Sequence, residues 1–156
     1  MHTRRITLLL FLASAAFGQD MKPNFTGTWR VMSIKPGNGL SSGIEERIEQ
    51  TDSTIAISTI EDKTTVLYRV VYPTDGQKIK TQHGRLTETN TGHWEGTRLI
   101  LESTGTFKWG VGKNHGPHTT RFVLSLSDDG KIMEHIHNVG GDSRHDVESI
   151  AERVVE

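Results

Sequence analysis

Short segments of alternating apolar and polar residues, separated by turn signals, follow one another along almost the whole chain. From residue 44 onward they recur about every 8–12 residues, the spacing typical of β-sandwiches and barrels. Segment 64–72 is the strongest, since nearly all its residues are β-branched or aromatic. No segment has a convincing helical period, so at most one short helix is expected, near 41–46. The pattern predicts an all-β domain.

The alternation also predicts where the individual strands lie. The expected strands cover residues 27–33, 44–49, a segment led by Ile55 and Ile57, 64–72, 79–83, 85–94, 98–103, 118–127, 131–138 and 145–155. Residues 36–43 and 105–117 are expected to form loops, because both are rich in glycine. The second loop is the longest irregular stretch, and a loop of that length in a small domain often has a function.

The N-terminus has the form of a secretory signal. A basic start is followed by the almost wholly apolar segment 6–17, and Ala16 and Gly18 are small residues at the positions a signal peptidase inspects. This apolar segment is too short to span a membrane. We expect residues 1–18 to be removed and residues 19–156 to form the domain, secreted or in a bacterial periplasm. Arg4 and Arg5 also permit a twin-arginine signal, although a plain basic segment fits better.

Composition excludes several classes of protein. The 156 residues have ordinary globular composition and room for one domain. Because the chain has no cysteine, it can have no disulfide, thiol nucleophile, thiolate metal site or lipoprotein anchor. Cleavage after Gly18 removes two arginines and no acidic residue, so the formal net charge falls from −1 to −3. A mildly acidic protein has no electrostatic reason to bind nucleic acid.

The segment Phe25-Thr26-Gly27-Thr28-Trp29 resembles the start of the lipocalins and fatty-acid-binding proteins, the calycin group. The resemblance implies an up-and-down antiparallel β-barrel of about eight to ten strands, closed so that no strand edge is free. It also implies structural roles for three residues. Gly27 and Trp29 open the first strand, the Trp29 indole plugs the closed end, and Arg153 of the last strand packs across that indole.

The layout is also similar to a group of small exported bacterial proteins that begin with a Phe-Ser/Thr-Gly-Thr-Trp element. The matching elements are Trp94-Glu95-Gly96, Asp129-Gly130-Lys131 and the C-terminal segment 151–155. That group is described by its fold and has no assigned biochemical role, so the resemblance implies a fold but no activity.

His135 and His137 lie two residues apart on one expected strand, so they share a face. If Asp129 and Gly130 form a tight hairpin turn, Leu124 lies opposite His135 and Phe122 lies opposite His137. Both imidazoles would then project into the interior, whereas a slip of one residue would move them to solvent. With a third ligand, the pair would suit zinc. Candidates for that ligand are His83, His93, His118 and His145, but hydrogen-bonded or exposed histidines fit better.

Two aromatic residues are further candidates for ligand contact. Tyr68, if it faces inward with Val66 and Val70, offers a hydroxyl group in an apolar cavity, although an ordinary core tyrosine explains it too. Trp109, with Phe107, lies in the expected long loop and could cover a barrel mouth or anchor the loop to the rim.

These observations favour an exported, monomeric, non-enzymatic protein that binds a small, partly apolar ligand without a cofactor. The candidate ligand-binding residues are Tyr68, Trp109, Phe122, His135 and His137. The segments 110–113 and 141–143 lack the spacing and setting of a phosphate loop and an esterase nucleophile. Two alternatives stay open: a zinc-binding protein that uses His135 and His137, and a packed structural or interaction module.

Overall fold

The computed structural model describes residues 22–35, 43–61, 65–109, 113–139 and 147–155. None of these residues lies in a helix, so no helix in this part of the chain could cross a membrane. The strands are β1 (Gly27–Lys35), β2 (Glu45–Gln50), β3 (Thr54–Ile60), β4 (Val66–Pro73), β5 (Lys78–His83), β6 (Leu86–Glu95), β7 (Arg98–Trp109), β8 (Lys113–Leu126), β9 (Ile132–Val139) and β10 (Val147–Arg153).

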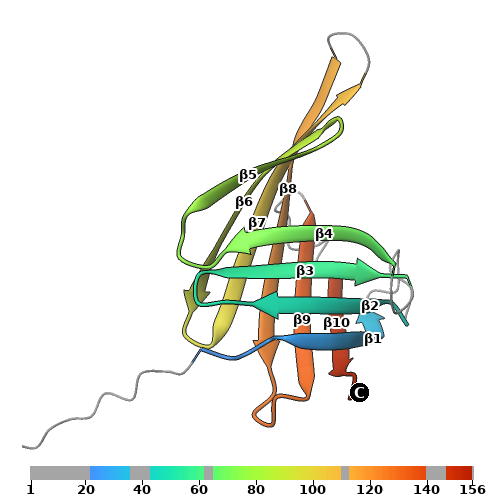
Figure 1. Cartoon of the computed structure of the whole chain (residues 1–156), viewed down its shortest axis with the longest axis vertical. Coiled ribbons are helices and arrows are strands. Elements are labelled where there is room, and N and C mark those ends of the chain that lie inside the picture. Colours follow the sequence, from blue (N-terminus) through green and yellow to red (C-terminus); the bar gives the residue numbers. More distant parts are fainter. Residues whose placement is uncertain (1–21, 36–42, 62–64, 110–112, 140–146, 156) are drawn as a thin grey trace, which may run out of the picture.

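All ten strands belong to one antiparallel sheet that curls into a barrel (Figure 1). Their order is β4-β3-β2-β1-β10-β9-β8-β7-β6-β5, so every strand except β4 and β5 pairs with each of its neighbours along the chain. The first and last strands pair with each other, with Trp29 opposite Arg153. The predicted fold class, an antiparallel lipocalin-like β-barrel, is confirmed.

The prediction that no strand edge is free is wrong for the described residues. No backbone ladder joins β4 to β5, and β4 instead lies against β6. Isolated hydrogen bonds cross the seam between β6 and β4 with the turn that follows it: Asn90 Nδ2 donates to the Val71 carbonyl at 3.2 Å, and Gly76 N in the turn donates to the Gly92 carbonyl at 2.8 Å. A Cβ atom on Gly92 would lie 2.5 Å from the Pro73 carbonyl oxygen, so glycine permits the close approach.

Strand alternation places one set of apolar side chains inside the curled sheet. Members of every strand except β5 take part, together with Phe25 ahead of β1. Trp29 and Phe25 are completely buried, and the Phe25 ring stacks on Trp94 with a centroid separation of 6.1 Å. These large rings fill one end of the barrel, because aromatic side chains bury more apolar area than any others.

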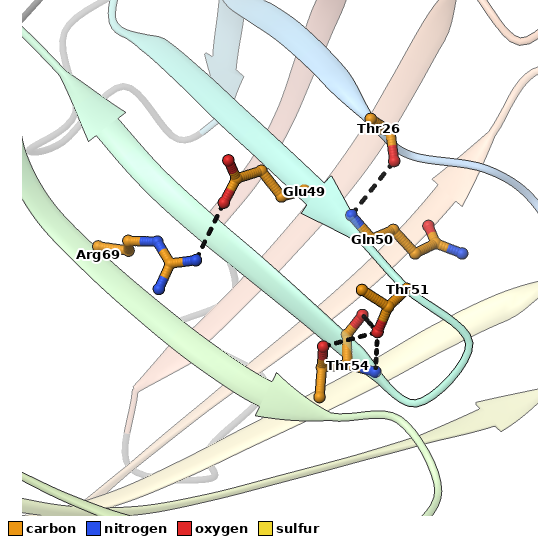
Figure 2. A network of polar contacts seen from close by, with 6 residues as sticks. All are labelled: Thr26, Glu49, Gln50, Thr51, Thr54 and Arg69. Atoms are coloured by element: carbon orange, nitrogen blue, oxygen red, sulfur yellow. Dashed lines mark hydrogen bonds and ion pairs between the residues drawn. The ribbon is translucent and has the colours of Figure 1, made fainter.

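Gln50, the last residue of β2, ties the segment before β1 to the sheet. Its backbone N donates to Thr26 Oγ1 at 3.2 Å (Figure 2), while its side-chain oxygen accepts from Phe25 N at 2.9 Å. In the adjoining turn, Thr51 Oγ1 accepts a hydrogen bond from Thr54 N at 3.0 Å. These contacts fix the turn between β2 and β3 and the position from which Phe25 enters the core.

One prediction of local structure is wrong. The segment 105–117 is not a long loop: β7 runs to Trp109 and β8 starts at Lys113, and their hairpin extends beyond the rest of the sheet (Figure 1). Cross-strand pairing, with Phe107 opposite His115, outweighs the weak strand preference of the glycines, and a bulge between Gly105 and Phe107 absorbs the irregularity. Glu45 and Glu46 open β2, in agreement with the strand expected over 44–49, so a short helix near 41–46 does not include them.

Candidate functional site

The interior holds a cavity of about 90 Å³ beyond the packed end of the barrel. Alternate residues of β3 and β4 form much of its wall, because side chains two apart on a strand share a face. The residues that line it are Glu46, Ile57, Thr59, Tyr68, Val70, Tyr72 and Phe122. The wall therefore combines apolar side chains with two phenol groups, a hydroxyl group and a carboxyl group.

Tyr68 stands at the edge of this cavity and is 41% exposed. Its hydroxyl group donates a hydrogen bond to Glu88 Oε2 at 2.9 Å and so links β4 to β6 across the seam. Burial, the hydrogen bond and the nearby Glu88 carboxylate raise the pKa of Tyr68 to about 12. The phenol is therefore a neutral hydrogen-bond donor at physiological pH.

Tyr72 lies deeper, where the cavity meets the core. Only 3% of it is exposed, and its ring meets Phe122 edge-on, with a centroid separation of 6.3 Å and an interplanar angle of 71°. Burial, then the proximity of Tyr68 and Glu88, raises the pKa of the Tyr72 phenol. This aromatic pair forms the buried end of the cavity.

Glu46 is a functional candidate that the sequence analysis missed. It lies between Trp29 on β1 and Thr59 on β3, on the face of β2 that also carries the buried Ile48. Burial raises the pKa of its carboxyl group. No ion pair or hydrogen bond to its side chain is found among the described residues. The sequence does contain a sign of its inward position, because Glu46 alternates with the apolar residues Ile44 and Ile48.

The predicted register of β8 and β9 is confirmed: Leu126 pairs with Met133, Leu124 with His135 and Phe122 with His137. The turn itself runs from Ser127 to Gly130, with Gly130 N donating to the Ser127 carbonyl at 2.8 Å and Gly130 at φ 68°. Glycine adopts that left-handed conformation without steric cost.

The predicted ligand-binding residues fall into two groups. Tyr68 and Phe122 line the same cavity. The side chains of His135, His137 and Trp109 lie outside the described part of the structure, so their predicted roles stay predictions. Among the described residues, no three metal-binding side chains gather at one place, which leaves the histidine pair untested as a zinc site.

Trp29 and Arg153 have the arrangement that the resemblance implied. The guanidinium carbon of Arg153 lies 4.4 Å from the centroid of the Trp29 ring. The same group donates to the carbonyls of Gly130 at 3.2 Å, Asn24 at 3.1 Å and Thr26. A Cβ atom on Gly27 would lie 2.9 Å from Arg153 Nη1, so glycine there leaves room for the guanidinium group.

The sheet topology and the interior cavity together define a lipocalin-like β-barrel protein. No family model matches the chain, and no curated protein matches it. Solved structures do match its fold.

One similar structure is a secretory abundant heat soluble (SAHS) protein from Ramazzottius varieornatus. It has a TM-score of 0.60 and 12% sequence identity, over 87% of this chain and 99% of that one. A second is human cRBP IV, with a TM-score of 0.57 and 13% identity, over 84% of this chain and 98% of that one. At such low identity the likeness shows a shared calycin-type barrel fold.

Proposed function

We propose that this chain is an exported, non-enzymatic protein that binds a small, partly apolar molecule inside its barrel. The observation that carries the proposal is the interior cavity, where Ile57, Val70 and Phe122 surround hydrogen-bonding groups of Tyr68 and Tyr72. Apolar walls with a few polar groups are typical of small-molecule sites. The fold of human cRBP IV, whose name stands for a cellular retinol-binding protein, supports the same proposal.

The volume limits the ligand. Sites for drug-sized molecules enclose about 300–1,000 Å³, whereas this cavity has about 90 Å³. The ligand therefore has only a few heavy atoms inside the wall, and any longer part extends through the mouth beside Tyr68. A retinoid-sized molecule would require the seam between β4 and β6 to open.

Export forms the second part of the proposal. The basic start, apolar segment 6–17 and small residues before Gln19 support removal of residues 1–18, which precede the described part of the chain. The domain 19–156 would then act as a monomer in the periplasm or outside the cell. Fractionation of expressing bacteria and N-terminal sequencing of the product test this, and an uncleaved cytoplasmic chain would contradict it.

Native mass spectrometry of mature protein, purified from its native envelope, tests the binding function directly. We expect a bound small molecule, lost when Val70→Phe fills the cavity. Val66→Phe is the matched control, since Val66 lies on the same strand but does not line the cavity. Protein that carries no small molecule, or carries it equally in both variants, would refute binding in the cavity.

Zinc binding is the second candidate function. The register supports it, because it places His135 opposite Leu124 and His137 opposite Phe122. Leu124 belongs to the buried core, and Phe122 packs against that core. Metal analysis of the same sample separates the two functions.

A further inference from the structure

The polar groups of known placement inside the barrel include two carboxyl groups and a buried amide, beside the hydroxyl groups of Thr59, Tyr68 and Tyr72. Glu46 lines the cavity, and the Glu88 carboxylate accepts a hydrogen bond from the Tyr68 hydroxyl group. Asn90 is completely buried; its amide nitrogen donates to the Val71 carbonyl, while its side-chain oxygen has no partner among the described residues. Two carboxyl groups and an unused amide oxygen thus project from the inner faces of β2 and β6.

The arginines of the neighbouring strands do not balance these acceptors. Arg30 pairs with Glu45 at 2.6 Å and Arg69 pairs with Glu49 at 3.0 Å, both in pairs exposed to solvent. Both glutamates belong to the outer face of β2, which alternates with the face of Glu46. Arg153 uses its donors on backbone carbonyls at the packed end. The side chains described around the cavity therefore include no cation that faces Glu46.

The rest of the wall is suited to a short apolar body. Ile57, Val70 and Phe122 provide hydrocarbon surface, and the rings of Tyr72 and Phe122 provide faces and edges. A cavity of about 150 Å³ accommodates benzene. The smaller volume of about 90 Å³ favours a chain of about four carbons.

We propose that this cavity takes small primary amines with a short apolar body, and that their ammonium group donates hydrogen bonds to Glu46. An ammonium group has three donors and no acceptor, so it can donate to the Glu46 carboxylate and to the hydroxyl oxygens of Thr59 and Tyr72 in the same wall. A carboxylate ligand would instead meet the Glu46 carboxylate as a like charge. Burial without a counter-cation raises the pKa of Glu46, and a bound ammonium would reverse that effect.

The inference rests on the proposed function, because it names the class of ligand that the same cavity selects. Its test compares n-butylamine, n-butanol and n-butyrate, which share a four-carbon body and differ in the head group. Each is titrated at pH 7 into mature, isotope-labelled protein, and binding is measured from the amide NMR shifts of Thr59, Val70 and Phe122. We expect n-butylamine to bind at least tenfold more tightly than n-butanol, and n-butyrate to give no saturable shift.

Two variants assign the selectivity to its residue. Glu46→Gln should reduce the affinity for n-butylamine at least tenfold, to that of n-butanol. Glu148→Gln, which removes an exposed carboxylate on β10, should leave all three affinities unchanged. The amide spectrum of each free variant shows whether its fold is preserved, and Glu46→Asp, which keeps the charge, should retain part of the preference.

The outcomes separate the two proposals. If n-butanol binds in the cavity as tightly as n-butylamine, or Glu46→Gln leaves the preference intact, the amine inference is overturned and the binding function stands. If none of the three compounds shifts the cavity resonances, the inference fails. If native ligand is also absent in the mass spectrum, the proposed function fails with it.

Discussion

Replacement of Arg153 by alanine should destabilise the domain strongly, because one half-buried side chain joins three separate segments. It lies 4.4 Å from the Trp29 ring centroid and donates to carbonyls of Asn24, Thr26 and Gly130. A cation over an indole contributes about 0.5–2 kcal/mol. Hydrogen bonds from a charged donor contribute about 1.5–3 kcal/mol when buried and less where solvent reaches them. We expect Arg153→Ala to lower the free energy of unfolding by about 2–4 kcal/mol.

The assay is urea unfolding of mature protein, followed by far-UV circular dichroism so that a change in Trp29 fluorescence does not confuse the result. In thermal unfolding the same loss corresponds to a fall in Tm of roughly 5–15 °C. Arg153→Lys should recover about half, since an ammonium group keeps the charge over the indole but cannot reach all three carbonyls.

Arg121→Ala is the matched control, because Arg121 is exposed and lies 3.8 Å from Glu102 on the outside of the barrel. Loss of such a surface pair changes stability by less than about 1 kcal/mol. A loss of stability in Arg153→Ala no larger than that in Arg121→Ala, or a lysine variant as unstable as the alanine variant, would refute this role of Arg153.

Further predictions concern the cavity, the seam and the histidines. Burial raises the pKa of Glu46 in the folded state, so the ionised carboxylate destabilises the fold. This loss of stability is absent below about pH 4.5 and grows as the pH rises through the folded-state pKa. Glu46→Gln should therefore stabilise the protein at pH 7 by about 1–3 kcal/mol, and this gain should vanish near pH 4. Urea unfolding at the two pH values measures it, and an equal gain at both would contradict the prediction. Gly92→Ala should lower stability by about 1–3 kcal/mol, since a Cβ would meet the Pro73 carbonyl, whereas Gly105→Ala meets nothing closer than 3.4 Å and should show no such steric loss. Calorimetric titration with zinc should give the same weak affinity in native protein and in His135→Ala/His137→Ala, and tight binding lost in the double variant would establish the metal-binding alternative.

The strands were predictable because alternation is a local signal. Apolar residues two positions apart, such as Ile55 and Ile57, indicate one face of a strand without any information from the rest of the chain. The pairing of Phe122 with His137 followed from one turn, since a hairpin's turn sets its register. The pairing of Trp29 with Arg153, 124 positions apart, required the family resemblance, because no local pattern predicts so distant a contact.

The unpredicted features depend on packing between distant segments. The missing ladder between β4 and β5 reflects the approach of β4 to β6, where Gly92 meets Pro73. The long β7–β8 hairpin is not predictable from its glycine-rich sequence, because pairing across the two strands outweighs the weak strand preference of glycine. Glu46 alternates with the apolar residues Ile44 and Ile48, which is compatible with an inward side chain, but no motif around it indicates a role for a carboxyl group.

The first and last strands of this domain lie side by side in the middle of the strand order, not at the edges of the sheet. The sheet edges fall at β4 and β5, which only residues 74–77 separate, while the two termini emerge beside each other at β1 and β10. A circular permutant that joins those termini and opens the chain within 74–77 would be a simple meander, in which each strand pairs only with its sequence neighbours. With its most distant pairing made local, such a chain should fold faster than the natural one.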